Sequence, residues 1–145
     1  MEQLPPNFVI VTLGVTDLDR SVAFYAGLGW EQRGDPSQGI VWFRTSGSWV
    51  GLFPLADLAA DVGVPADAPS GFRGATYAVN LPDEDAVDAG FATVRELGAR
   101  VVKKPTRTEF GGYSGYFEDP DGHLWELCFN PGFPLDDDGR IDIGG

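Results

Sequence analysis

The 145-residue chain has one cysteine, one histidine and one methionine. A single cysteine cannot form an internal disulfide, so the fold must depend on packing, and a lone buried thiol usually serves as a small apolar side chain. Nowhere do about eighteen apolar residues occur together, and the first residues, MEQLPPNF, lack a basic start followed by an apolar run. We therefore expect a soluble, cytoplasmic protein with no membrane partner.

Basic residues are also scarce. Ten Lys and Arg stand against 22 Asp and Glu, which gives a formal charge of −12. Such a chain would be repelled by nucleic acid, so we expect no nucleic-acid partner. The acidic stretches DLAADVGVPADA, DEDAVD and DDDGRID are typical of a solvated surface, although the same field would also attract cationic ligands. With 43% apolar residues, the chain can form one globular domain spanning residues 1–145.

The first half of the chain, residues 8–54, carries the signals of a strand, a helix and three more strands. VIVTLGV is rich in branched apolar residues and predicts a strand. Asp17 or Thr16 can cap a helix that ends at Gly29, with an apolar stripe between them at helical spacing. The segments WEQRG, GIVWFRT and SWVGLFP follow as strands, separated by turn signals.

The same order returns in residues 72–131, after a linker at residues 55–71 and before a tail at residues 132–145. GATYAVNL predicts a strand, residues 82–98 a helix, and ARVVKKP, YSGYFED and HLWELCF three strands. The apolar stripes of the two helices match at a constant offset of 69 residues, which indicates a duplicated module. One helix covers only one face of each sheet, so we expect the other faces to line a trough shared with the companion module, a second chain or a ligand.

The segment GYFEDPDGHLWELCFNP holds the only histidine and an acidic residue between apolar neighbours. DPDG is a strong turn signal, so the flanking residues should form a hairpin. Side chains alternate along a strand, which places Glu126 and Cys128 on one face and His123 on the other. His123 and Glu126 therefore cannot share a metal ion, and we interpret His123 as a turn-end residue and not a catalytic one.

Glu126 is expected on the trough side. Burial of an unpaired carboxylate is costly, so Glu126 should be partly solvated, protonated, or paired with a cation such as Arg44, Arg73 or Lys103. The alternative is a structural acid that binds a backbone amide or an arginine.

The duplicated order, the opening VTLGVTDLDRSVAFYAGLGW and the closing GYFEDPDGHLWELCFNP together resemble the vicinal oxygen chelate superfamily. This superfamily contains glyoxalase I, bleomycin-resistance proteins, extradiol dioxygenases, fosfomycin-resistance proteins and methylmalonyl-CoA epimerase. The resemblance implies an α+β fold in which two tandem βαβββ modules form a curved eight-stranded trough. It also implies a homodimer, because such proteins commonly build the pocket where modules of one or both chains meet.

Metal-dependent members of this superfamily place ligands on the first and last strands of each module. Carried over to this chain, those positions fall on Ile10, Gly51, Ala75 and Glu126. Only Glu126 could bind a metal ion, whereas catalytic zinc has three or more protein ligands. The resemblance with only this one ligand retained therefore implies no metal cofactor, and it argues against glyoxalase I or dioxygenase activity.

Residues on the same predicted face as those positions would line the trough. They form an aromatic pocket suited to a flat organic molecule, or they pack the core between the modules. The glycine-rich segment TEFGGYSGY is either a lid over the trough or an ordinary strand connection. The predicted ligand-binding residues are Ile10, Trp49, Gly51, Phe53, Ala75, Tyr77 and Cys128, with Phe110 and Tyr113 on the lid.

Two functions from different classes follow. The first is a metal-independent small-molecule-binding protein of the bleomycin-resistance type, which sequesters a drug or natural product. The second is a lyase, isomerase or cyclase in which Glu126 acts as general base and Tyr113 or Tyr77 donates a hydrogen bond to the enolate. A protein–protein contact role remains as a third hypothesis.

Overall fold

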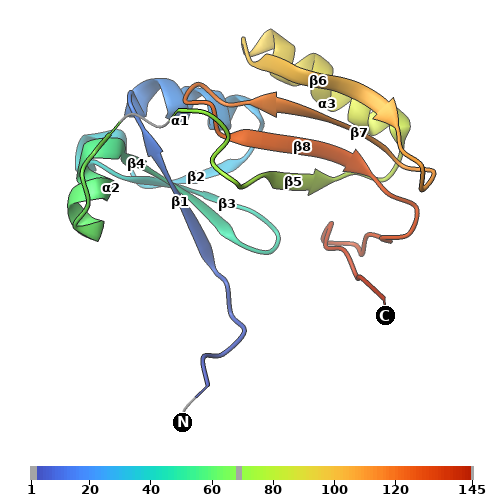
Figure 1. The fold of residues 1–145 in the computed structure, drawn as a ribbon, viewed down its shortest axis with the longest axis horizontal. Helices are drawn as coiled ribbons and strands as arrows, with labels where there is room; N and C mark the ends of the chain where they lie inside the picture. Colours follow the sequence, from blue (N-terminus) through green and yellow to red (C-terminus); the bar gives the residue numbers. More distant parts are fainter. Residues whose placement is uncertain (1–2, 68–69, 145) are drawn as a thin grey trace.

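The computed structural model describes residues 3–67 and 70–144. The first module forms the N-terminal half of the chain (Figure 1). Asp17 caps the first helix by accepting a hydrogen bond from the backbone N–H of Arg20, which satisfies one free donor of the first turn. A short 3-10 helix follows the second strand. The elements are β1 (Ile10–Val15), α1 (Leu18–Gly27), β2 (Glu31–Arg33), η1 (Pro36–Gln38), β3 (Val41–Arg44) and β4 (Trp49–Pro54).

The second module repeats this order after a helix that lies in the linker. Asp83 caps the module's helix by accepting from the N–H of Ala86. The linker helix was not expected from the sequence. Its Leu55 and Leu58 contact the first sheet beside Gly14. The elements are α2 (Leu55–Val62), β5 (Tyr77–Asn80), α3 (Glu84–Glu96), β6 (Arg100–Arg107), β7 (Tyr113–Glu118) and β8 (Leu124–Phe129).

Each module forms its own four-stranded mixed sheet. The strand order is β1-β4-β3-β2 in the first sheet and β5-β8-β7-β6 in the second. The first and last strands of each module pair in parallel, and the remaining pairs are antiparallel. This confirms the predicted α+β class with two tandem βαβββ modules. No helix in the described ranges is long and apolar enough to cross a membrane.

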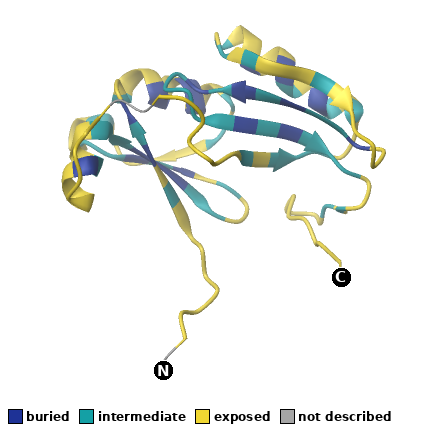
Figure 2. Cartoon of the chain, viewed as in Figure 1, coloured by how far each residue is buried: buried dark blue, intermediate teal, exposed yellow. Residues whose placement is uncertain are grey.

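The two sheets turn their helix-bearing faces toward one another across α1. The Tyr25 ring of α1 lies 5.9 Å from Phe43 of the first sheet and 6.0 Å from Trp125 of the second, measured between ring centroids. The Phe24 ring of α1 also reaches the second sheet, with its centroid 6.3 Å from that of Phe117. Buried residues from both modules thus form one continuous core around α1, visible as dark bands on the facing strands (Figure 2).

The opposite side of each sheet, here called its open face, therefore points away from α1. Along the paired strands, side chains of opposite residues share a face. The open face of the first sheet carries Ile10, Thr12, Trp42, Arg44, Trp49, Gly51 and Phe53, and that of the second carries Ala78, Asn80, Ser114, Tyr116, Glu126 and Cys128. One chain consequently does not place the two open faces opposite each other.

The four edge strands differ in charge. The outer edges are β2, with the sequence EQR, and β6, with RVVKKPTR, and both carry charged side chains. The other two edges are β1 (IVTLGV) and β5 (YAVN), and neither has a charged residue. Charged edges discourage pairing with other chains, whereas uncharged edges permit it. This contrast distinguishes the edges that face solvent from those suited to a partner.

Candidate functional site

Glu126 lies in a row of side chains that crosses the second sheet. Lys103 is opposite Tyr116, Tyr116 is opposite Glu126, and Glu126 is opposite Ala78. β8 is an inner strand flanked by β5 and β7, so the Glu126 side chain lies over the middle of the sheet. The small side chain of Ala78 leaves room beside the carboxylate. The row therefore presents an acid next to a phenol on a surface open to a ligand.

The surroundings of Glu126 keep the neighbouring groups neutral. Burial and the negative charge of Glu126 raise the pKa of the Tyr116 hydroxyl above its ordinary value. Burial and the same carboxylate also raise the pKa of the Cys128 thiol. Tyr116 thus stays a hydrogen-bond donor at neutral pH, and Cys128 stays a thiol and not a thiolate nucleophile.

Glu126 makes no ion pair with any described residue. The sequence offered Arg44, Arg73 and Lys103 as partners, and the ion pairs of the described chain include none of them with Glu126. Arg73 instead donates to the backbone oxygen of Asp121 at 2.6 Å. Of the expected alternatives, a partly solvated Glu126 fits the half-buried side chain.

The open face of the first sheet is aromatic around a glycine. A Cβ added at Gly51 would lie 3.3 Å from both the Thr12 hydroxyl and the Trp42 ring, so the indole packs against the bare backbone. Trp49 and Ile10 are paired beside them. Phe53 belongs to this face too, at the end that α2 covers. The predicted residues Ile10, Trp49, Gly51 and Phe53 thus share one face, as expected.

The predicted placement of Tyr77 and Ala75 is wrong. Tyr77 pairs with Trp125, and the two rings lie 5.2 Å apart on the helix-bearing side of the second sheet. Ala75 precedes β5 and does not belong to its open face. The residue of β5 that lies opposite Glu126 is Ala78, and Asn80 lies opposite Cys128. The open face of β5 therefore carries Ala78 and Asn80 in place of Ala75 and Tyr77.

The glycine-rich segment divides between a turn and a strand. Phe110 is 83% exposed in the turn before β7, so its lid role stays a prediction. Tyr113 is the first residue of β7, and its hydroxyl donates to Asp88 of α3 at 2.7 Å. The Tyr113 side chain therefore points to the helix-bearing side and cannot reach Glu126. Its predicted lid and catalytic roles are wrong.

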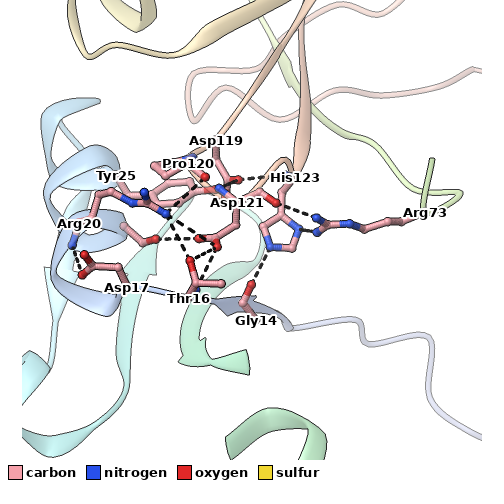
Figure 3. A network of polar contacts seen from close by, with 11 residues as sticks. Gly14, Thr16, Asp17, Arg20, Tyr25, Arg73, Asp119, Pro120, Asp121 and His123 are labelled. Carbon is pink, nitrogen blue, oxygen red and sulfur yellow. Dashed lines mark hydrogen bonds and ion pairs between the residues drawn. The ribbon is translucent and has the colours of Figure 1, made fainter. Parts of the chain in front are cut away.

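A polar network joins the β7–β8 turn to the start of the first module (Figure 3). His123 bonds the Gly14 carbonyl through Nε2 at 2.9 Å, so Nε2 carries the proton and Nδ1 accepts from Arg73. Asp121 accepts from the backbone N–H and the hydroxyl of Thr16, at 2.9 and 2.7 Å. The contacts to Gly14 and Thr16 bridge more than 100 residues of sequence. His123 thus fixes the modules together, and its position opposite to Glu126 is confirmed.

The residues present do not fit a resident metal ion. No three His, Cys, Asp or Glu side chains in the described ranges lie close enough to hold one. A second chain that placed its first sheet opposite Glu126 would add Thr12 and Gly51, which supply no carboxylate, imidazole or thiolate. One carboxylate falls short of the ligand sets of zinc and of other catalytic divalent ions.

Sequence reasoning missed Tyr116, Trp42 and Asn80. Tyr116 and Trp42 could have been found, because alternation from Glu126 across the DPDG turn, and from Gly51 across the SGS turn, places both on the open faces. The placement of Asn80 on the open face could not be predicted, because the sequence did not determine which side chains of β5 point to that face.

Two tandem βαβββ modules, each with its own four-stranded mixed sheet, define a two-module class of fold. The chain belongs to the Glyoxalase/Bleomycin resistance protein/Dioxygenase superfamily, whose family model matches residues 7–127. Proteins of this superfamily bind small molecules. The recognised resemblance is thereby confirmed.

Individual relatives are more distant. The chain is 29% identical to a metallothiol transferase FosB from Shouchella clausii over 120 residues, which are 81% of this chain and 75% of the relative. A glyoxalase-related enzyme from Fulvimarina pelagi is 29% identical, with a TM-score of 0.87 over 97% of this chain and 100% of that one. A glyoxalase/bleomycin resistance protein/dioxygenase from Nocardioides is 26% identical, with a TM-score of 0.74 over 93% of each chain.

Proposed function

We propose that this protein is a metal-independent binder of small organic molecules, and that its ligand lies between the open faces of two chains. The row containing Glu126 and Tyr116 carries this proposal, because it offers an acid and a neutral phenol on an uncovered sheet. The aromatic face around Gly51 offers the opposite wall. A flat ligand with a cationic group suits this combination, as in the sequestration of a drug or natural product.

The arrangement of the modules supports a homodimer as the functional unit. Within one chain the two open faces point away from the shared core, so each lacks a facing wall. The uncharged edges β1 and β5 are the places where a second copy can continue each sheet. A two-fold pair would place the first sheet of one chain beside the second sheet of the other and create two equal troughs.

Metal chemistry is not part of this proposal. The name of the FosB relative describes a metallothiol transferase, but the positions that would hold a metal here are occupied by residues without donor side chains, apart from Glu126. The same donor set argues against glyoxalase I and dioxygenase reactions. The proposal accordingly assigns Glu126 to ligand recognition.

A second candidate function is a metal-independent lyase, isomerase or cyclase. The neighbouring pair of Glu126 and Tyr116 favours it: a carboxylate can abstract a proton next to a carbonyl, and a phenol held neutral can donate a hydrogen bond to the resulting enolate oxygen. Tyr116 takes the role that sequence reasoning gave to Tyr113 or Tyr77. Both candidate functions use the same face.

The test is a panel of cationic aromatic natural products, titrated against protein labelled with 5-fluorotryptophan. Fluorine signals of Trp42 and Trp49 should shift on binding, because both lie on the open face. Glu126→Gln should weaken cationic ligands by about tenfold and leave neutral analogues unchanged. Glu96→Gln, on the exposed side of α3, is the matched control.

The same variant separates the two candidates. If the protein is an enzyme, Glu126→Gln should keep affinity for the substrate and lose turnover, because the amide cannot accept the proton. A turnover rate that is unchanged in Glu126→Gln would remove Glu126 from any mechanism. Ligand-induced shifts confined to Trp30 and Trp125 would contradict binding at the open faces.

A further inference from the structure

A second cavity lies on the other side of the sheets. It is a cleft of about 950 Å³ between the helix-bearing sides of the two sheets, where α1 ends and no helix fills the gap. Its volume is within the range of pockets that hold drug-sized molecules. Glu126 and Tyr116 do not line it, and of the row around Glu126 only Ala78, on the edge strand β5, also lines the cleft. The cleft therefore meets the open face of the second sheet along β5, and its aromatic floor lies on the other side of that sheet.

The inner part of the cleft is aromatic. Trp125 packs against Trp30 at 5.4 Å and against Tyr77 at 5.2 Å, measured between ring centroids, and all three line the cleft. Val11 and Val79 add aliphatic walls. Neither the Trp30 indole nor the Tyr77 hydroxyl is hydrogen-bonded to another described residue, while the Trp125 indole donates to Tyr25. A planar aromatic molecule could stack here with two donors on the lining residues.

The outer part of the cleft is formed by the β3–β4 turn and the C-terminal tail. The tail folds into an ordered turn in which Asp136 accepts from the backbone N–H groups of Asp138 and Arg140, each at 2.9 Å. Arg140 then donates through Nε to the backbone oxygen of Ser46 at 2.9 Å. The tail thus connects the end of the second module to the first and closes one side of the cleft.

Two arginines give this outer part its charge. Arg44 and Arg140 both line the cleft, and neither forms an ion pair with a described carboxylate. Arg44 pairs with Trp49 at the end of β3, so it lies at the rim where the cleft meets the open face of the first sheet. Of the acids that also line it, Glu31 is held by Arg33 at 2.5 Å, which leaves Asp138. The chain has only ten Lys and Arg in all, so two guanidinium groups beside an aromatic floor, neither in an ion pair of the described chain, are a specific feature. Guanidinium groups bind carboxylates with two parallel hydrogen bonds.

We propose that this cleft is a second binding site, for a planar aromatic carboxylate. The ring system stacks among Trp30, Tyr77 and Trp125, and the carboxylate contacts Arg44 and Arg140 at the outer end. The site requires a charge opposite to that of the cationic ligand proposed for the open face. The two sites can therefore be told apart by ligand charge.

The test uses 2-naphthoate as the probe, with 2-naphthylmethanol and 2-naphthylmethylamine as neutral and cationic controls. In 5-fluorotryptophan protein, whose four signals are assigned by single Trp→Phe variants, 2-naphthoate should shift Trp30 and Trp125 and leave Trp42, which lies on the open face away from the cleft, in place. By calorimetry, 2-naphthoate should bind about tenfold more tightly than the alcohol. The amine should bind more weakly than either.

Variants test the charge and the stacking separately. Arg44→Gln and Arg140→Gln should each weaken 2-naphthoate by about five-fold. Arg44→Gln should leave the alcohol unchanged, whereas Arg140→Gln also removes the hydrogen bond to Ser46 that closes one side of the cleft. Arg107→Gln, on the outer edge strand, is the control and should change nothing. Both cleft arginines are exposed, so the fold should tolerate the changes, and circular dichroism checks that it does. Equal affinity for all three probes, absence of binding at millimolar concentration, or shifts confined to Trp42 and Trp49 would overturn the proposal.

Discussion

The hydroxyl of Tyr25 donates a buried hydrogen bond to Asp119, 94 residues further along the chain, at 2.7 Å. The same hydroxyl accepts from the indole N–H of Trp125 at 3.0 Å. Asp119 in turn accepts from the backbone N–H groups of Asp121 and His123, both at 2.9 Å. One tyrosine of the first module thereby orders the turn of the second. The two modules are joined by this bond as well as by apolar contact.

Removing that hydroxyl should destabilise the fold. Tyr25→Phe leaves the buried oxygen of Asp119 and the indole of Trp125 without a partner, so the free energy of unfolding should fall by about 1–3 kcal/mol. Tyr113→Phe is the matched control, since its hydroxyl also bonds an aspartate at 2.7 Å but at an exposed position. That change should stay within about 0.5 kcal/mol. Urea unfolding measures both, and equal effects would contradict the argument.

Alkaline pH should act through the same residue. Burial, with the neighbouring charge of Asp119, raises the pKa of Tyr25 well above its ordinary value of 10.0. Below about pH 10 the phenol is protonated in both states, so it adds no pH dependence. Above that pH the Tyr25 phenol of the unfolded chain gives up its proton first. The free energy of unfolding should therefore fall by up to about 1.4 kcal/mol per pH unit.

The measurement compares the pH dependence of unfolding in wild type and Tyr25→Phe from neutral pH to pH about 11. The variant should be less stable than wild type at neutral pH, but its free energy of unfolding should decrease less steeply as the pH rises above about 10. Tyr113 and Tyr116, whose pKa values are also raised, are present in both proteins and cancel in the comparison. Parallel curves would contradict the assignment to Tyr25.

The fold could be predicted because its signals are local. Asp17 and Asp83 cap the two helices, the apolar stripes repeat, and DPDG fixes a hairpin. Once the hairpin is fixed, alternation determines that Glu126 and His123 lie on opposite faces. These features depend on residues close together in sequence, which is why they required no knowledge of tertiary structure.

The side of the sheet to which each β5 side chain points could not be predicted from the corresponding residues of β1. The capping residues Asp17 and Asp83 are 66 positions apart, whereas the residues that end the helices, Leu28 and Leu97, are 69 apart. α3 is longer than α1 by this difference. An odd difference inverts the alternation of a strand, so the offset of the helix stripes gives the wrong face for Tyr77. Only the pairing of Tyr77 with Trp125 resolves it.

The sequence also did not show which faces of the two sheets pack against each other. An amphipathic helix shows that a sheet has one covered face, but not which other elements share that cover. Here Phe24 and Tyr25 extend from α1 to the second sheet, so the open faces point apart. Long-range contacts such as these leave no periodic signal in the sequence.

A close backbone approach makes Gly115 sensitive to substitution. A Cβ at this position would lie 2.6 Å from the backbone oxygen of Lys103 and 2.8 Å from the nitrogen of Pro105. Gly115→Ala should therefore force β6 and β7 apart and cost about 2–3 kcal/mol of unfolding free energy. Gly47→Ala meets nothing within 4 Å and should be nearly neutral. Thermal denaturation of both variants checks this, and a neutral Gly115→Ala would contradict the close approach.

Metal removal should leave the protein unchanged. Glu126 is the only metal-binding side chain among the four positions that correspond to the ligands of metal-dependent relatives. Elemental analysis should therefore find no stoichiometric metal. EDTA, Zn²⁺, Ni²⁺, Mn²⁺ and Fe²⁺ should each shift the melting temperature by less than about 1 °C. Glu126→Ala should respond in the same way. A shift of several degrees that Glu126→Ala abolishes would restore metal chemistry to this site.

Ile10 offers a direct test of the proposed dimer. It lies on the uncharged edge strand β1, is 44% exposed, and belongs to no part of the monomer core. Ile10→Asp should leave the circular dichroism spectrum intact and raise the dimer dissociation constant by at least about tenfold, because it places a charge where β1 meets the partner. Sedimentation equilibrium measures this constant.

Ala92→Asp is the control for the added charge, since Ala92 is exposed on α3, which packs on the side of the second sheet opposite to its open face. It should leave the dimer intact. If Ile10→Asp and Ala92→Asp weaken the dimer equally, general repulsion between two acidic chains is responsible and β1 is not the contact. If the wild-type chain is a monomer at all accessible concentrations, Glu126 must bind its ligand on a single open sheet, and the shared trough is wrong.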